Sequence, residues 1–165
     1  MTGPKPSTKP APKPVVERDI AVNRRARHDY AIEDVWEAGL VLTGTEVKSL
    51  RTGKATITEG YIRLDDSGEA WLTGAHIQPW TSGNRFNHEL ARPRKLLLHR
   101  RELERMIGKV ARDGYTLIPM RLYFSGGRAK LEIGLGKGKR DYDKRQDDKE
   151  RDAKRSIAQA KRRER

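Results

Sequence analysis

The sequence predicts a mainly β protein, a small antiparallel OB-like β-barrel of about six strands with short flanking helices and a disordered basic C-terminal tail. Two observations support this fold class. The middle of the chain alternates apolar and polar residues over short segments separated by turn residues, as strands do. Both ends are rich in Lys and Arg and poor in apolar residues, so they cannot bury a core. A mixed α+β sandwich is the alternative, because the order of the elements does not separate the two folds.

Charge and composition divide the 165 residues into three regions. Residues 1–19 are predicted to be a disordered leader rich in Pro and Lys, residues 20–136 the barrel, and residues 137–165 the tail. The net charge is +13, yet residues 28–136 hold 16 Lys or Arg against 14 Asp or Glu. Two basic arms on a nearly neutral domain are typical of a protein that binds nucleic acid. Arms that only make the domain soluble are the alternative.

A basic cluster precedes the first predicted strand. The run Asn23–His28 contains three arginines and a histidine. Attached to a rigid element, these side chains can be directed at phosphates better than those of a free tail. A solvated linker is the alternative reading of this run.

The first predicted strand, Tyr30–Leu42, has a bend or bulge at Gly39. A short helix of about two turns follows, because Thr43 and Glu46 form a capping box and Gly53 is suited to end the helix.

Two strand-like runs come next, 55–64 and 69–79, joined by the polar turn 65–68. Residues 78–93 show no periodicity and predict a long surface loop. After them, Arg94–Leu98 predicts a short strand, and from His99 to about Gly114 the apolar spacing becomes that of an amphipathic helix with a basic outer side.

The clearest hairpin is predicted last. Residues 118–124 and 129–135 alternate strictly, and Ser125-Gly126-Gly127 turns the chain between them. Pro119 predicts an edge or a bulge. The glycine run Gly134–Gly138 ends this strand and precedes no apolar helix, so it predicts a flexible exit from the barrel rather than a nucleotide-binding loop.

No catalytic or metal-binding pattern emerges from the residues. The chain has no cysteine, and its four histidines, at positions 28, 76, 88 and 99, are isolated from one another. No stretch is apolar enough for a secretory signal or a membrane span. We therefore expect a cytoplasmic protein that is not an enzyme and uses no cofactor and no metal.

Five segments together resemble the SsrA-binding protein family, whose members partner tmRNA in rescuing stalled bacterial ribosomes. The resemblance lies in residues 23–28, 36–40, 44–51, 92–99 and 136–145. It implies an OB-like barrel that binds the tRNA-like domain of tmRNA, with RNA-facing residues Asn23, Arg24, Arg25, Arg27, Glu37 and Leu97. The same segments contain the basic residues His28, Lys137, Lys139 and Arg140, which are predicted to contact RNA as well.

Two of these positions have structural alternatives. Glu37 could form a salt bridge within the sheet instead of contacting RNA. Leu97 could belong to the core, since alternation alone makes Leu96 and Leu98 equal candidates for the exposed position.

For the tail, the resemblance implies insertion into the small ribosomal subunit, with residues Tyr142, Asp143, Lys144 and Arg145 in the decoding centre and a helix containing Ile157 in the empty mRNA channel. Ile157 is the one sizeable apolar residue of that helix, too little to stabilise it alone. The tail is therefore predicted to be helical only on the ribosome.

The resulting prediction is a trans-translation adaptor that delivers tmRNA to stalled ribosomes. Its predicted partners are tmRNA, small-subunit ribosomal RNA and, indirectly, the elongation factor that carries tRNA. Neither DNA nor a membrane is an expected partner. A structural ribosomal protein or another OB-type RNA-binding module is the alternative, and an RNA-modifying enzyme has no supporting residues.

Overall fold

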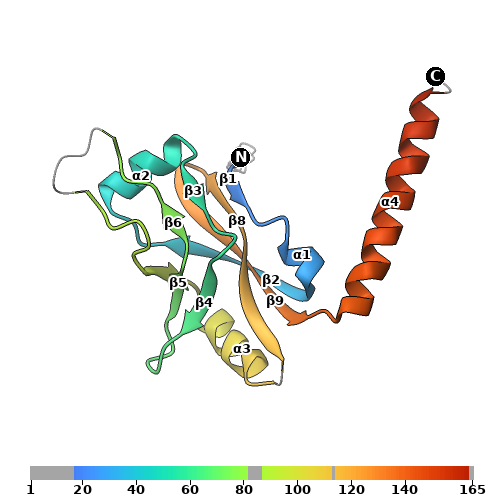
Figure 1. Ribbon diagram of the computed structural model, residues 1–165. Coiled ribbons are helices and arrows are strands. Elements are labelled where there is room, and N and C mark those ends of the chain that lie inside the picture. Colours follow the sequence, from blue (N-terminus) through green and yellow to red (C-terminus); the bar gives the residue numbers. More distant parts are fainter. Residues whose placement is uncertain (1–16, 82–86, 113, 164–165) are drawn as a thin grey trace, which may run out of the picture.

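The computed structural model describes residues 17–81, 87–112 and 114–163 (Figure 1). Most strands belong to one antiparallel sheet of seven strands in the order β1-β8-β9-β2-β7-β5-β4. Their bounds are β1 (Glu17–Val22), β2 (Tyr30–Leu40), β4 (Tyr61–Leu64), β5 (Ala70–Thr73), β7 (Arg94–Leu97), β8 (Tyr115–Ser125) and β9 (Arg128–Gly138). A second, two-stranded sheet pairs β3 (Ala55–Thr56) with β6 (His76–Ile77).

The large sheet curls so that β4 at one edge packs near β8, close to the other edge. Among the described residues no hydrogen-bonded ladder joins the two edges, so the barrel is open. In the described part of the chain the helices are α1 (Ala26–Asp29), α2 (Gly44–Arg51), α3 (Arg100–Val110) and α4 (Asp141–Arg163). The first three lie against the barrel, whereas α4 extends away from it. The mainly β, OB-like class predicted from the sequence is confirmed.

The core lies inside the curled sheet and under α2 and α3. Strand β9 shows the predicted alternation, because Leu131, Ile133 and Leu135 are all buried. Met106 is the fully buried residue of α3, as its apolar stripe requires. The register of β8 and β9 shifts between Pro119 and Arg121, which confirms a bulge at the proline.

The predicted helix starts and the first hairpin are also confirmed. Helix α2 has a capping box, in which the Thr43 side chain accepts from the backbone of Glu46. In the β4–β5 turn, the Asp65 carboxylate accepts hydrogen bonds from the backbone N–H of Glu69 at 2.9 Å and from Trp71 Nε1 at 2.8 Å.

The structure corrects the two long strands predicted for 55–64 and 69–79. Each is divided into two short strands, β3 with β4 and β5 with β6. Gly74 interrupts the second run with a φ of +74°, a conformation that favours glycine. A Cβ atom there would also lie 2.9 Å from the Glu59 carbonyl oxygen, so the chain turns closely past residues 59–60.

The glycine run predicted as a flexible exit is part of strand β9, which continues to Gly138. Gly134 is buried, and a Cβ atom at this position would lie 2.9 Å from Met120 Sδ. Gly136 is equally crowded, with Ile32 Cδ1 and Tyr30 Cβ both 3.0 Å from the added atom. These glycines are therefore required by close packing of β9 against its neighbours.

Strand β1 and helix α1 were not predicted. Strand β1 pairs with β8, and Arg121 of β8 binds Asp19 at 2.8 Å and Glu17 at 3.1 Å. Residues 17–19 were assigned to the disordered leader, but they lie in this strand. The rest of that predicted leader, residues 1–16, lies outside the described residues.

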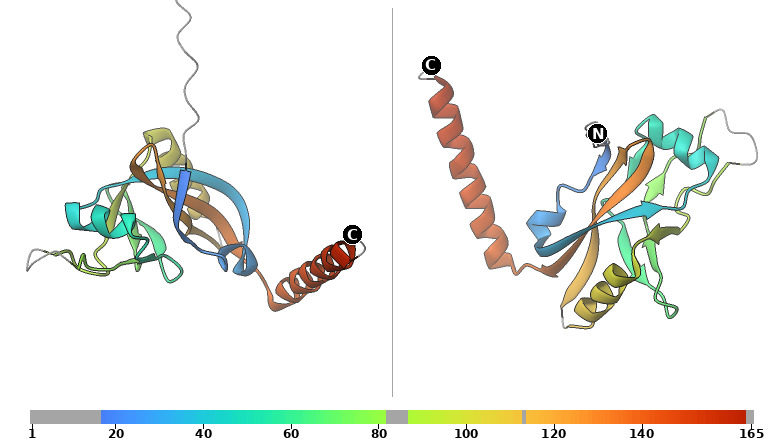
Figure 2. Two further views of the ribbon diagram at one scale, coloured as in Figure 1. Left: turned by 90° about the horizontal axis from the view of Figure 1, so that it is seen from above. Right: turned by 180° about the vertical axis from the view of Figure 1, so that it is seen from behind.

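Helix α4 projects from the end of β9, away from the barrel (Figures 1 and 2). Its side chains are largely exposed, including Tyr142 at 76% and Ile157 at 57%. That the helix forms only on the ribosome stays a prediction. No helix in the described part of the chain has the length and apolar character needed to cross a membrane.

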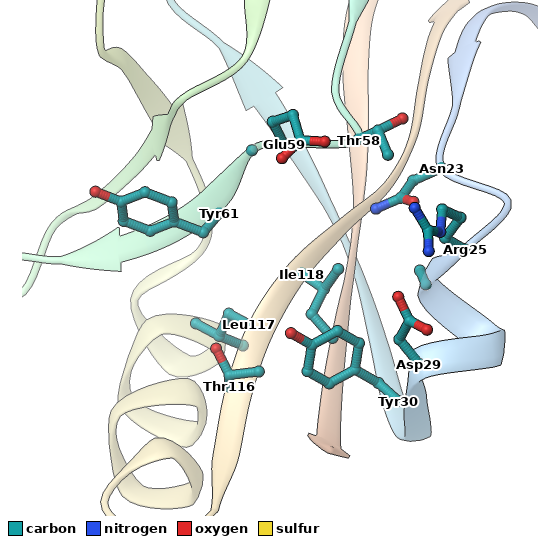
Figure 3. A pocket seen from close by; sticks show the side chains of 12 residues that line it. Asn23, Arg25, Asp29, Tyr30, Thr58, Glu59, Tyr61, Thr116, Leu117 and Ile118 are labelled. Carbon is teal, nitrogen blue, oxygen red and sulfur yellow. The ribbon is translucent and has the colours of Figure 1, made fainter. Parts of the chain in front are cut away.

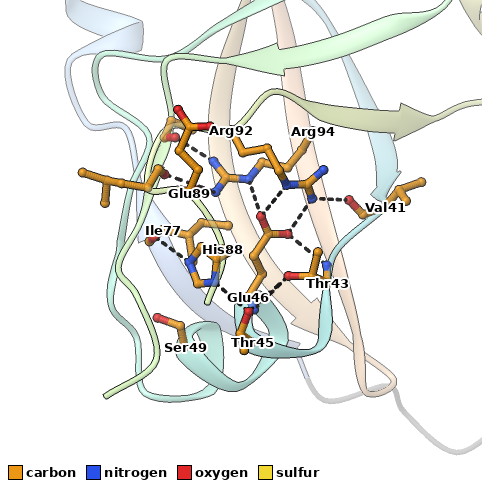
Figure 4. Close-up of polar contacts among 12 residues, drawn as sticks. Val41, Thr43, Thr45, Glu46, Ser49, Ile77, His88, Glu89, Arg92 and Arg94 are labelled. Atoms are coloured by element: carbon orange, nitrogen blue, oxygen red, sulfur yellow. Dashed lines mark hydrogen bonds and ion pairs between the residues drawn. The ribbon is translucent and has the colours of Figure 1, made fainter. Parts of the chain in front are cut away.

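A buried ion-pair network joins α2 to the segment that leads into β7 (Figure 4). The Glu46 carboxylate accepts from Arg92 Nη2 at 2.8 Å and from Arg94 Nε at 3.1 Å. The side chains of Glu46 and Arg94 are completely buried. Burial favours a higher pKa of Glu46, but the hydrogen bonds from Arg92 and Thr43 and the charge of Arg94 leave this pKa below its ordinary value.

Replacing Glu46 with alanine should lower the free energy of unfolding by about 3 to 5 kcal/mol, because Arg94 would remain buried without a counter-charge. Urea unfolding measures the loss. The matched control is Glu69→Ala, which removes an exposed pair with Lys95 and should cost about 1 kcal/mol or less. Equal losses in the two variants would show that the Glu46 network stabilises the fold no more than an exposed ion pair does.

Candidate nucleic-acid interface

A shallow hollow of about 360 Å³ opens where β2, β7 and β9 meet the start of α3, and we call it the Glu37 hollow. It is lined by Glu37, Gly39, Leu97, Leu98, His99, Glu102 and Lys130. Two of the predicted RNA-facing residues, Glu37 and Leu97, are thus brought together. Lys130 was not predicted, because only the strand register, which pairs it with Gly39, places it here.

Glu37 is held by two donors. Its carboxylate accepts a hydrogen bond from the Tyr123 hydroxyl and forms an ion pair with Lys130 Nζ at 3.1 Å. The hydrogen bond from Tyr123, followed by that from Lys130, lowers the pKa of Glu37. Burial, and then the same bond, raises the pKa of Tyr123. Glu37 therefore presents an ionised, oriented acceptor at neutral pH, with half of its side chain exposed.

Leu97 forms an apolar ridge beside this acceptor. It is 53% exposed, whereas Leu96 is buried in the core and Leu98 is partly buried against it. Leu97 pairs with Gly39, where an added Cβ atom would lie 3.4 Å from the Leu97 Cβ. The ridge also borders a second, more apolar hollow of about 450 Å³ lined by Leu40, Leu42, Val47 and Phe124.

The predicted arginines lie at the other end of β2, around α1. Arg24, Arg25 and Arg27 are exposed, as are Lys137 and Arg140 of the facing strand end. Ala31 pairs with Lys137 and Gly39 with Lys130, so the two ends of this ladder lie about 25 Å apart at about 3.3 Å per residue. The structure therefore separates the predicted contacts into two surfaces.

Asn23 differs from its predicted neighbours because it is buried. Its backbone N–H donates to the Met120 carbonyl at 2.8 Å, and its side-chain Nδ2 donates to the Pro119 carbonyl at 3.0 Å. Both bonds attach it to the bulge of β8. Its Oδ1 is buried and has no hydrogen-bond partner among the described residues. Asn23 also lines a hollow of about 250 Å³ between α1, β4 and β8 (Figure 3).

The first turns of α4 are attached to α1 by charged contacts, which we call the tail latch. His28 Nε2 lies 3.0 Å from Asp148 Oδ1, and His28 Nδ1 lies 3.0 Å from Asp29 Oδ1.

Two lysines complete the tail latch. Lys139 binds Asp147 and donates to the Arg27 carbonyl at 2.8 Å. Lys144 lies 3.8 Å from Asp29. Two residues predicted to bind RNA, His28 and Lys139, are thus engaged by acidic residues of the tail.

The fold and these surfaces define a class of protein. An open OB-like barrel with exposed basic residues at its ends is a nucleic-acid-binding module. Among the described residues no three His, Asp or Glu side chains are grouped so that they could hold a metal ion.

The chain belongs to the SmpB protein family, whose profile matches residues 20–163. It is 58% identical over 146 residues to the SsrA-binding protein of Roseiflexus castenholzii, covering 88% of this chain and 92% of the relative. It is 56% identical over 148 residues to that of Thermobifida fusca, covering 90% and 92%. These matches confirm the resemblance carried by the five segments.

A solved structure reported as "tmRNA-SmpB: a journey to the center of the bacterial ribosome" contains a similar chain. The two are 48% identical with a TM-score of 0.61, over 78% of this chain and 87% of the other. Both the sequence and the fold therefore place the chain in the same family.

The tail latch should weaken as the pH rises. Hydrogen bonds to Asp29 and then Asp148 raise the pKa of His28 above 6.5. The ion pair between protonated His28 and Asp148 is fully present below pH 6.5 and is lost as the pH rises through the raised pKa of His28. Because the chain has no cysteine, spin labels can be placed through Lys48→Cys and Ala153→Cys. The distance distribution between them should broaden with rising pH.

In that measurement, His28→Gln should give the broad distribution at every pH, while the control His76→Gln should follow the parent protein. A transition that persists unchanged in His28→Gln would assign the pH dependence to another group.

Proposed function

We propose that the chain is an RNA-binding adaptor of trans-translation, which binds the tRNA-like domain of tmRNA and delivers it to stalled ribosomes. Membership of the SmpB family over both the barrel and α4 carries this proposal. A relative solved as part of a tmRNA-SmpB assembly with the ribosome supports both partners. In this function the chain acts by binding tmRNA, so its residues must recognise the RNA and position it on the ribosome.

The Glu37 hollow is suited to recognition of a base rather than of the backbone alone. A carboxylate would repel phosphates, but it accepts hydrogen bonds from the amino and imino groups of base edges. Lys130 offsets its charge, and Tyr123 keeps it in one orientation. Leu97 offers an apolar surface on which a base or ribose can lie. Together these groups favour an unpaired nucleotide of a folded RNA.

The basic surface around α1 would supply contacts that do not depend on sequence. Arg24, Arg25 and Arg27 present guanidiniums suited to phosphate, and Lys137 and Arg140 add charge beside them. Asn23 is better placed to shape this surface than to contact RNA, because both of its donor groups are used within the fold.

We further propose that α4 enters the decoding centre and the empty mRNA channel of the small subunit. The helix has 23 residues, so it is about 35 Å long. Tyr142 is exposed at its start and can stack on a base, beside Asp143, Lys144 and Arg145. Farther along, Ile157 is an isolated exposed apolar residue. Ribosomal RNA would provide the charge and surface that stabilise the helix.

Changing Leu97 to Asp should lower the affinity for the tRNA-like domain of tmRNA about tenfold, because roughly half a leucine side chain loses its apolar contact. Stability should change little, since Leu97 is exposed. The control is Val35→Asp, which changes a residue of similar exposure, 47%, on β2. Filter binding and thermal unfolding of both variants provide the test. If the two variants bind equally well, Leu97 is not part of the RNA interface.

Deleting residues 141–165 should leave tmRNA affinity within about threefold of the full chain but abolish tagging of stalled products. The cut follows Arg140, so that Lys139 keeps its backbone hydrogen bond to the Asp29 carbonyl. A translation assay on messages without a stop codon measures tagging. Tagging by the truncated chain would show that α4 is not required in the channel, and stoichiometric binding to all ribosomes would instead favour a structural ribosomal protein.

A further inference from the structure

We propose that the outer face of α3 is a docking track for the sugar-phosphate backbone of the tmRNA strand that occupies the Glu37 hollow. This α3 track consists of Arg101, Arg105 and Gly108. The inference rests on the proposed function, because it names a second surface for the same RNA. It is carried by three observations: unpaired arginines, an unexplained glycine and continuity with the hollow.

Two of the basic residues of α3 are already paired within the fold. Arg100 pairs with Glu104 at 3.4 Å. Lys109 binds Asp34, and its Nζ lies 5.8 Å from the centre of the Trp36 ring. Arg101 and Arg105 are exposed and make no ion pair or side-chain hydrogen bond with any described residue. Their charge is therefore available to a partner.

These two arginines are four residues apart, so they lie on one face of the helix about 6 Å apart along its axis. Successive phosphates of an RNA strand have a similar separation. The acidic residues of α3 do not oppose the pair, because Glu104 is bound to Arg100 and Glu102 caps the helix at His99. The face is thus locally cationic.

Gly108 follows the two arginines on the same face of α3. Apart from proline, glycine is the least favourable residue in a helix interior. A Cβ atom at Gly108 would meet nothing within 4 Å, so packing within the described chain does not require a glycine. A partner that approaches the helix backbone closely would require one, and an RNA backbone held by the neighbouring arginines does so.

The α3 track is continuous with the Glu37 hollow. His99 and Glu102, at the start of α3, line the Glu37 hollow together with Leu97 and Lys130. An RNA strand placed in the hollow therefore reaches the α3 track directly. The track begins at the hollow, at the end of β2 opposite the tail latch, so tmRNA is favoured over ribosomal RNA as its occupant.

The test is the salt dependence of binding to the tRNA-like domain of tmRNA. Binding of this RNA by the wild-type protein is measured first. If the wild type does not bind it, the proposed function itself is rejected. The double variant Arg101→Ala/Arg105→Ala should reduce the log–log salt slope by about 0.7 to 0.9 for each contact. Affinity near 0.1 M salt should fall roughly tenfold or more. The control is Lys48→Ala/Arg51→Ala, which removes the same charge from exposed positions of α2 and should leave the slope within error of wild type.

A third variant, Gly108→Gln, tests close approach without a change in charge. It should keep or raise the melting temperature, weaken RNA binding several-fold and leave the salt slope unchanged. Equal slopes for wild type and the arginine variant would overturn the proposal, as would equal losses in the arginine variant and its α2 control. Loss of ribosome binding with unchanged tmRNA binding would also overturn it, because the track would then face ribosomal RNA.

Discussion

The buried pair of Glu46 and Arg94 is the interaction on which the end of the barrel that holds the Glu37 hollow depends. A carboxylate and a guanidinium that are both fully buried must be paired, because either charge alone would be costly. The pair links α2 to the first residue of β7, and Arg94 also donates to the Ala75 carbonyl at 2.8 Å. Arg92, which is partly exposed, binds the same Glu46 carboxylate at the protein surface. One contact thus joins segments that are far apart in the sequence.

The position of Leu97 follows from this anchor. Strand β7 is short and pairs with β2 only at Gly39 with Leu97 and Leu40 with Leu96. Arg94, three residues before Leu97, fixes where the strand begins. Leu97 is consequently held beside Glu37 and Lys130, which come from β2 and β9. The base recognition proposed for the Glu37 hollow requires such fixed geometry. The ion-pair network provides it from the core-facing side of β7.

The barrel also separates two tasks. The Glu37 hollow and the start of the α3 track lie near one end of β2, and the basic surface around α1 lies at the other end with the base of α4. The acidic residues Asp147 and Asp148 turn toward His28 and Lys139, so the free protein orients the start of its tail. In the proposed function, this arrangement lets the barrel hold tmRNA while α4 extends toward the ribosome.

Local signals in the sequence were sufficient to predict several elements of the fold. Alternation specified the β8–β9 hairpin, a capping box specified α2, and helical spacing specified α3. Five segments identified the family. Strand β1 and helix α1 were not predicted. For β1 the reason is that its own residues, ERDIAV, alternate only weakly, so the strand depends on its pairing with β8. Three features of the candidate site became visible only in the folded chain: Leu97 rather than Leu96 is exposed, Lys130 pairs with Glu37, and Asn23 is buried. Each of them depends on strand register and on contacts between distant segments, which local sequence patterns do not encode.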